Sequence, residues 1–224
     1  MYRCRVPRTS SPALRLMLVE RAAEMLARRE PVTLRALVAG TGASTMAVYT
    51  HFDGMPGLWR AVRQEGFTRL ARRLDEVETT DDPVRDLAAL GAAYLTHALA
   101  DPALYRVMFD AAADLDDPDE AARSFEHLVV AADRARRTRR FREDADPEAV
   151  ATRYWAAGHG LVMLVLTGVL PFEALATHAP AMACAEFVAA GDDPRRSAAS
   201  VRSGWAGVEL ERPVGSDSRR PADV

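Results

Sequence analysis

Apolar residues recur every three to four positions along most of the chain, which is the spacing of helices that bury one face. The first such segment runs from Leu14 to Arg29 and is followed by Pro31, which cannot continue a helix. Two short segments come next, Thr33 to Ala39 and Ser44 to Phe52. No segment shows the alternation of apolar and polar residues that is typical of strands. The pattern therefore predicts an all-α protein.

The remaining helices are predicted from their starts and stops. Asp-Pro pairs and isolated Pro residues mark the starts, and Gly, Pro or acidic loops mark the ends. The predicted helices cover residues 56–77, 83–100, 102–112, 120–137, 147–170 and 172–190, the last with a break at Pro180. We expect a small N-terminal domain with a polar arm (1–54), a linking fourth helix (55–77), a larger helical domain (78–190) and a disordered polar tail (191–224).

The two short helices have the features of a helix-turn-helix. Gly42, in the turn Thr41-Gly42-Ala43, supplies the positive φ that a tight turn between packed helices needs. Val48 and Phe52 are one helical turn apart and are predicted to face the core. The rest of the second helix then faces outward: Thr45, Ala47, Tyr49, Thr50 and His51.

An exposed second helix of this kind suits the major groove of DNA, where hydroxyl groups reach base edges and phosphates. Arg35 can reach phosphate or guanine, and the helix starts at Thr33 and Ser44 offer backbone N–H groups to phosphates. For His51 two interpretations stay open: contact with DNA, or packing within the turn.

Charge is unevenly distributed along the chain. Up to Arg73 there are 13 Arg residues against five acidic residues, a net charge of +8, whereas the remainder carries −11. A basic N-terminal third on an acidic body is typical of a nucleic-acid-binding domain joined to a domain that does not bind nucleic acid. The Arg-rich segment Arg134 to Arg142 could bind an anion, but it is interpreted as a solvated loop beside the acidic segment Asp114 to Glu120.

The sequence lacks patterns that would indicate an enzyme or a metal site. Cys4 and Cys184 lie far apart, and the five His residues are scattered without HExxH, GxSxG or a phosphate-binding glycine loop. We therefore expect no catalytic site, no metal and no cofactor.

The chain opens without a secretory signal, which favours the cytoplasm. The apolar stretch Trp155 to Phe172 is interpreted as a buried or interfacial helix rather than a membrane span.

The N-terminal motif resembles the TetR family of transcription regulators. The resemblance covers roughly Leu14 to Phe67 and rests on Thr33-Leu34-Arg35-Ala36-Leu37-Val38, Thr41-Gly42-Ala43-Ser44 and the ending Val48-Tyr49-Thr50-His51-Phe52. It implies that Arg35, Thr45, Ala47, Tyr49 and His51 lie at the DNA face, with Tyr49 on phosphate. One departure is Met55, which stands where family members often carry a phosphate-contacting Lys.

The C-terminal half resembles one subgroup of the same family. The matching segments are Tyr154-Trp155-Ala156-Ala157-Gly158-His159-Gly160 and Pro102 to Phe109. The resemblance implies a homodimer formed by the last two helices of each subunit and an apolar effector pocket. Candidate pocket residues are aromatic, His and Met side chains, a kind of residue that more often belongs to a plain core: Tyr94, His97, Tyr105, Phe109, Phe125, Trp155, His159 and Met163.

The function indicated is a ligand-responsive regulator, most simply a repressor that a small apolar molecule releases from a near-palindromic double-stranded DNA operator. The alternative is a helical dimer that acts through protein interaction and carries a degenerate DNA-binding head.

Overall fold

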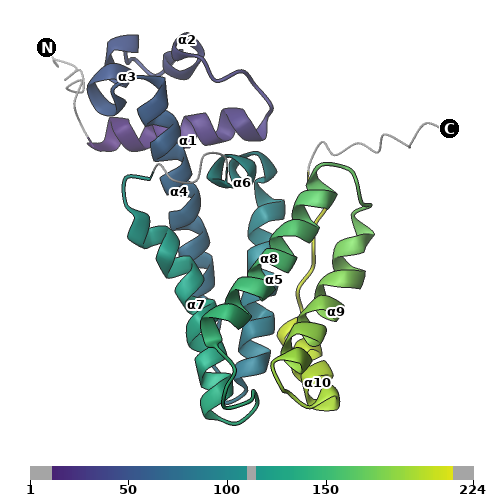
Figure 1. The fold of residues 1–224 in the computed structure, drawn as a ribbon. Coiled ribbons are helices and arrows are strands. Elements are labelled where there is room, and N and C mark those ends of the chain that lie inside the picture. Colours follow the sequence, from purple (N-terminus) through teal and green to yellow (C-terminus); the bar gives the residue numbers. More distant parts are fainter. Residues whose placement is uncertain (1–11, 110–114, 214–224) are drawn as a thin grey trace, which may run out of the picture. The chain divides into compact units, whose positions relative to one another are not determined.

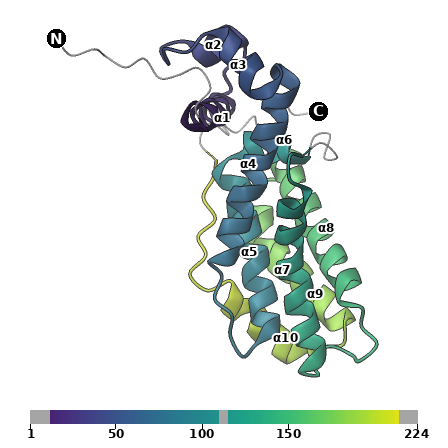
Figure 2. The ribbon, with the colours of Figure 1, turned by 90° about the vertical axis from the view of Figure 1, so that its left-hand side faces the viewer.

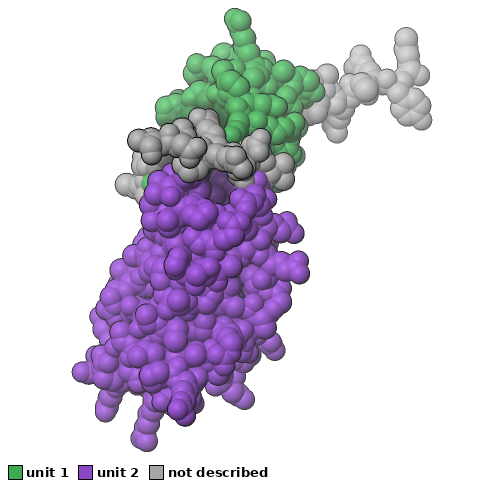
Figure 3. All heavy atoms as spheres, turned by 90° about the vertical axis from the view of Figure 1, so that its right-hand side faces the viewer, with its two compact units in different colours: residues 1–69, 103–121 green, residues 70–102, 122–224 purple. Residues whose placement is uncertain are grey.

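The computed structural model describes residues 12–109 and 115–213, and within these ranges it contains ten α-helices and no β-strand (Figure 1). The expected all-α fold is confirmed. The chain divides into two compact units, one of residues 1–69 and 103–121 and one of residues 70–102 and 122–224 (Figure 3). The predicted N-terminal arm, the end of the predicted helix 102–112 and the last eleven residues of the predicted tail lie outside the described residues.

The first unit contains α1 (Pro12–Ala27), α2 (Leu34–Val38), α3 (Thr45–Phe52), most of α4 (Met55–Asp75) and most of α6 (Pro102–Phe109). Its core consists of apolar side chains that the helical spacing of the sequence places on one face of each helix. Their most deeply buried members come from α1 to α4: Leu18, Ala22, Leu37, Val48, Leu58 and Val62. This core orients α3, the second helix of the helix-turn-helix.

The second unit contains α5 (Pro83–Ala100), most of α7 (Pro118–Arg137), α8 (Pro147–Leu166), α9 (Glu173–Ala189) and α10 (Pro194–Gly204). Asp82, Asp146 and Asp193 cap α5, α8 and α10, and in each case the first helical residue is Pro. An Asp cap accepts hydrogen bonds from N–H groups without a helical partner, and Pro is tolerated where no N–H is needed. Helix α8 packs on α5 and α9, and α10 packs on α5 and α9 (Figure 2).

The prediction of a disordered tail from residue 191 is wrong for residues 194–204, which form α10. The buried face of this helix is made of small residues, Ser197, Ser200 and Gly204 with Val201, so the sequence reads as polar. Gly204 lies so close to α5 that an added Cβ would be 2.5 Å from the Arg85 carbonyl oxygen. Small residues are buried here because two helix backbones approach closely.

Two helix ends also differ from prediction. Helix α9 continues through Pro180 without a break, since buried residues on both sides of the proline, Leu175 and Phe187 among them, hold the two halves in line. Helix α8 ends at Leu166 rather than at residue 170, because Gly168 adopts a φ of 79° in the turn that follows.

Buried charges connect the helices of the second unit. Arg140 donates to both carboxylate oxygens of Asp192, at 2.8 and 2.7 Å, to Asp82 at 2.6 Å and to Ser200 at 3.0 Å. The hydrogen bond to Asp192 is the main reason why the pKa of Arg140 is raised. Arg134 donates to the buried Asp86 at 2.8 Å. The interpretation of the Arg-rich segment as a solvated loop beside residues 114–120 is therefore wrong for Arg134 and Arg140.

Helix α8 is the helix of the described residues that is long and apolar enough to cross a membrane, judged by length and composition alone. That criterion is weak evidence for a single helix, because a helix that packs in a core or an interface also meets it. Two apolar side chains of α8 and its C-terminal turn, Leu164 and Val169, are exposed in the isolated chain.

Candidate nucleic-acid interface and effector cavity

Helix α3 has one buried face and one exposed face. Ala47, Val48 and Phe52 are buried in the first unit, whereas Met46 is 65% exposed and Tyr49 is 50% exposed. A helix held in this way presents a fixed set of side chains to solvent, which is the requirement for inserting a helix into a DNA groove.

The turn before α3 is fixed by two left-handed glycines and one threonine. Gly40 and Gly42 both have a φ of 73°, so the turn uses one more positive φ than the sequence predicted. Thr41 Oγ1 donates to the Val38 carbonyl at 2.8 Å and accepts from the Ala43 N–H at 3.1 Å. These contacts set the angle between α2 and α3.

The prediction that Ala47 faces outward is wrong. Its side chain is 1% exposed and belongs to the core beside Val48. The outward position is taken by Met46, which lies three residues before Tyr49 and therefore on the same helix face. Helical spacing from Tyr49 would have identified Met46, whereas the motif match drew attention to the small Ala47 instead.

The other predicted DNA-binding residues occupy defined positions at the starts and along the exposed face of the two helices. Thr33 caps α2 by accepting from the Ala36 N–H at 3.2 Å, and Arg35 is exposed on the same helix. Ser44 is the exposed N-cap residue of α3, but its side chain makes no capping hydrogen bond. Thr45 is half-buried. Thr50 is exposed, and its hydroxyl donates to the Met46 carbonyl at 2.9 Å.

The position of His51 favours packing over DNA contact. Its ring is half-buried and lies against Phe52 with ring centroids 6.1 Å apart. Its Nε2 is shielded from solvent and has no hydrogen-bond partner in the described structure.

The junction between α3 and α4 depends on close backbone contacts. Asp53 ends α3 with a φ of 55°, and Gly54 follows with a φ of 97° against the Tyr49 ring. A Cβ added to Gly57 would lie 1.7 Å from the Phe52 carbonyl oxygen, so only glycine fits at this point. Helix α4 therefore starts in direct contact with the end of α3.

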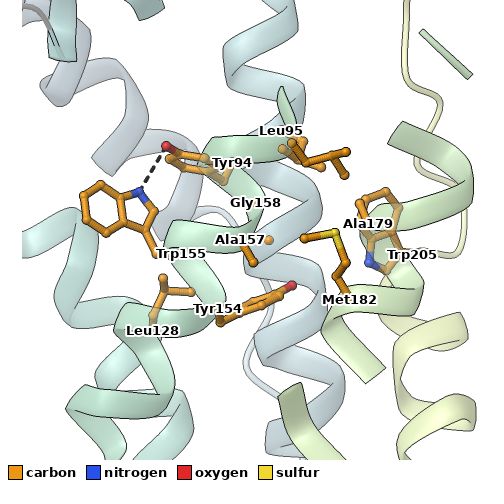
Figure 4. A pocket seen from close by; sticks show the side chains of 12 residues that line it. Tyr94, Leu95, Leu128, Tyr154, Trp155, Ala157, Gly158, Ala179, Met182 and Trp205 are labelled. Carbon is orange, nitrogen blue, oxygen red and sulfur yellow. Dashed lines mark hydrogen bonds between the residues drawn. The ribbon is translucent and has the colours of Figure 1, made fainter. Parts of the chain in front are cut away.

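The second unit contains a small apolar cavity between α5, α7, α8 and α9 and the end of α10 (Figure 4). Its free volume is about 30 Å³, and its walls carry no charged side chain. Lining side chains include Tyr94 and Leu95 of α5, Tyr154 and Trp155 of α8, and Met182 of α9. Trp205, directly after α10, completes the wall.

Two of the lining residues, Tyr94 and Trp155, belong to a hydrogen-bonded chain of three predicted residues that also includes His159. The Trp155 indole N–H donates to the Tyr94 oxygen at 3.0 Å, and the Tyr94 hydroxyl lies 3.1 Å from His159 Nδ1. Since the Tyr94 oxygen accepts from Trp155, the Tyr94 hydroxyl can donate its own hydrogen to a neutral His159. Burial lowers the pKa of His159, which favours this neutral form.

The structure gathers the predicted effector residues only in part. Tyr94 and Trp155 line the cavity, while His159 and Phe125 contact Trp155 at ring-centroid distances of 6.0 and 6.1 Å. His97 and Met163 do not line it. Tyr105 and Phe109 belong to the first unit, where their rings contact each other and Phe109 contacts Phe67.

Most cavity residues were not identified from the sequence as effector contacts, among them Tyr154, Met182 and Trp205. Trp205 was assigned to the disordered tail, and without α10 no signal places it near α5. Across residues 12–109 and 115–213, no group of three or more His, Cys, Asp or Glu side chains is placed to hold a metal ion.

Residues 87–190 match the family model described as the tetracyclin repressor-like C-terminal domain. A structure of a protein with unknown function from Rhodococcus sp. RHA1 is 24% identical, with a TM-score of 0.68 over 84% of this chain and 100% of that chain. RolR in complex with resorcinol is 17% identical, with a TM-score of 0.64 over 90% and 96%. A gamma-butyrolactone receptor (ArpA-like protein) is 21% identical, with a TM-score of 0.53 over 89% and 96%.

None of the curated proteins gives a significant match to the sequence. The solved structures show the same fold, from the helix-turn-helix through the C-terminal helices, and the family model matches the C-terminal domain itself. The chain therefore has the fold of these regulators, and its residues 87–190 match the tetracyclin repressor-like C-terminal domain.

Proposed function

We propose that this protein is a ligand-responsive DNA-binding transcription regulator, and most simply a repressor. The observation that carries the proposal is that α3 has one buried and one exposed face. The buried face fixes the helix in the first unit, while Met46, Tyr49 and Thr50 are exposed to solvent. The match of residues 87–190 to the tetracyclin repressor-like C-terminal domain supports the proposal, and the basic charge of the N-terminal third, +8 up to Arg73, supports contact with DNA. Regulators of this family are DNA-binding proteins, and we assign the chain no catalytic role.

The chemistry of the exposed face indicates how DNA is read. Tyr49, Ser44 and Arg35 are the groups that reach phosphate, and Thr50 and Thr45 carry hydroxyls for base edges or phosphates. The exposed Met46 is apolar, and the apolar feature of the major groove is the thymine methyl group. We therefore expect α3 to prefer sites in which a thymine faces Met46.

We propose that the operator-binding form is a cytoplasmic homodimer built on α8 and α9. In the isolated chain these helices and the turn after α8 leave apolar side chains in solvent, including Leu164, Val169 and Met182. A second copy of the chain would cover them through the same surface. Two recognition helices about 34–36 Å apart then enter successive major grooves, and the operator is near-palindromic.

The ligand response is proposed to travel through α4. This helix is continuous from Met55 to Asp75, and the division between the two units falls within it. A ligand that is bound in the second unit and favours one arrangement of α4 changes the spacing of the recognition helices. The affinity for DNA can then fall by at most the ratio of the ligand's affinities for the two arrangements of α4.

Binding to the intergenic DNA beside the protein's own gene tests the proposal, measured by fluorescence anisotropy at about 50 and 200 mM salt. Sequence-specific binding that salt weakens and that both Arg35→Ala and Tyr49→Ala impair is the expected result. Glu24→Ala, an exposed α1 residue, is the matched control. Failure to select any sequence from a pool of genomic fragments would contradict the proposal and favour a helical dimer that acts through protein interaction.

A further inference from the structure

The cavity of the second unit holds two polar groups that have no partner in the described structure. The Trp205 indole Nε1 is shielded from solvent and donates to nothing. Tyr154 is a buried residue with an exposed fraction of 7%, and its hydroxyl makes no hydrogen bond to a described residue, although its oxygen is not fully shielded from solvent. The Tyr94 and Trp155 polar groups, by contrast, bind each other. Polar groups buried without partners are rare, because burial removes the water that would satisfy them.

Tyr154 is held with its hydroxyl at the cavity wall. An added Cβ on Gly91 would lie 1.9 Å from the hydroxyl oxygen, so glycine on α5 makes the space that the phenol occupies. Burial also raises the pKa of Tyr154, which keeps the hydroxyl protonated and able to donate. In Figure 4 its oxygen points toward the side of the cavity where Met182 lies.

Trp205 is held in the wall by the packing of α10. Gly204, the residue before it, lies against the α5 backbone, where an added Cβ would be 2.5 Å from the Arg85 carbonyl oxygen. Ser200, one turn earlier, accepts from Arg140 at 3.0 Å and donates to Asp82 at 2.6 Å. These contacts fix the backbone from which the Trp205 side chain extends, and the indole Nε1 is shielded from solvent.

The remaining surface of the cavity restricts the ligand. Apart from the tyrosine and tryptophan polar groups, the lining is hydrocarbon, glycine and one thioether, with no side chain to balance a charge. A charged ligand would lose its hydration without compensation. The free volume of about 30 Å³ holds one or two waters, so a larger ligand must displace side chains. Met182, an unbranched thioether side chain, is the adaptable part of the wall.

We propose that this cavity is the effector site and that it takes a compact, uncharged, mostly apolar molecule with one carbonyl oxygen, to which the Trp205 indole N–H donates. The Tyr154 hydroxyl provides the second polar contact. This inference rests on the proposed function, since it names the chemical class of the effector. It also assigns effector recognition to a residue outside the matched family domain, which ends at residue 190.

The test compares two molecules of the same shape, cyclohexanone and methylenecyclohexane, of which only the ketone accepts a strong hydrogen bond. Binding is measured by calorimetry on the full chain and on Trp205→Phe and Tyr154→Phe. We expect Trp205→Phe to weaken the ketone about five- to tenfold and to change affinity for the alkene less than twofold. Equal losses for both molecules, or no ketone binding up to millimolar concentration, would overturn the proposal.

Tyr154→Phe shows whether the Tyr154 hydroxyl binds the effector or stabilises the fold. Because the hydroxyl has no partner in the folded protein, removing it is expected to leave the melting temperature unchanged or higher while it weakens the ketone several-fold. A lower melting temperature together with unchanged ketone affinity would show a structural role and overturn the assignment of Tyr154. DNA binding is measured in parallel: specific DNA binding without ketone binding defeats this inference alone, and the reverse result defeats only the proposed function.

Discussion

The two units of the molecule are stabilised in different ways and carry their functional residues in different places. The first unit has an apolar core and close backbone contacts, and its functional face is the exposed side of α3. The second unit adds a buried ion-pair network around Arg140, and its candidate effector site is an internal cavity. An exposed site on a short motif depends on local spacing, whereas an internal cavity depends on contacts between segments far apart in the chain.

The exposed site and the internal site differ because DNA and a small apolar effector have different physical properties. DNA is large and highly charged, so a reader of DNA needs an accessible, rigid helix. A small apolar effector needs to be removed from water, so its site lies inside a helical bundle. Variants that affect one unit and spare the other therefore test whether these two roles are separate.

The largest effect is expected from Asp192→Asn in the second unit. The change leaves Arg140 buried with one of its two carboxylate partners lost, and breaking a buried pair of this kind costs about 3–5 kcal/mol. Urea unfolding at fixed protein concentration, followed through Trp155 and Trp205, measures it. Asp144→Asn is the matched control, because Asp144 and Arg142 form an exposed pair that contributes less than about 1 kcal/mol. Equal effects of the two changes would contradict the role of the buried network.

In the first unit the corresponding change is Gly57→Ala. The added Cβ would overlap the Phe52 carbonyl oxygen at 1.7 Å, and since backbone cannot rotate away, the start of α4 must shift. We expect a loss of about 3 kcal/mol, reported by Trp59, together with weaker DNA binding. Gly158→Ala in α8 is the control, where nothing lies within 4 Å of the added atom. Unchanged DNA binding by a folded Gly57→Ala would show that the α3–α4 junction does not position α3.

The smallest expected effect concerns pH and the second unit. Burial lowers the pKa of His159 below its ordinary value of 6.5, so just below that pH the unfolded chain binds a proton that the folded chain does not. The contribution to stability is complete above pH 6.5 and is lost as the pH falls through the lowered pKa. His159→Gln should remove this part of the pH dependence of the free energy of unfolding, measured by urea unfolding at pH values above and below 6.5. His178→Gln, at an exposed position of α9, should leave it unchanged, and the opposite pattern would refute the assignment.

The sequence predicted most of the fold because its helix signals are local. Asp82 followed by Pro83 marks the start of α5, and the predicted range 83–100 is the observed one. Gly42 likewise placed the turn correctly, and Val48 and Phe52 are buried in α3 as predicted, although Ala47 is buried beside them. Each of these features is decided by a few neighbouring residues, whatever the rest of the chain does.

The wrong predictions concern elements whose structure depends on contacts between residues far apart in the sequence. Helix α10 was missed because Ser197, Ser200 and Gly204 look solvent-exposed unless α5 is known to lie against them. Arg140 looked like part of a surface loop for the same reason, because Asp82 and Asp192 are 58 and 52 residues away in sequence. The cavity could not be predicted from the sequence, since its wall requires both α10 and the close approach of Tyr154 to Gly91.

The central claim is that the exposed face of α3 reads DNA. The most direct test is to measure specific DNA binding by a variant with one added charge on that face. Met46→Glu places a carboxylate on the exposed face of α3 without touching the core, and Val130→Glu places one at an exposed position of α7 in the second unit. The account predicts that Met46→Glu weakens operator binding by roughly a hundredfold, through repulsion from phosphates, with unchanged stability. Val130→Glu should bind as the unmodified protein does. Operator binding that survives Met46→Glu would show that the exposed face of α3 is not the surface that reads DNA.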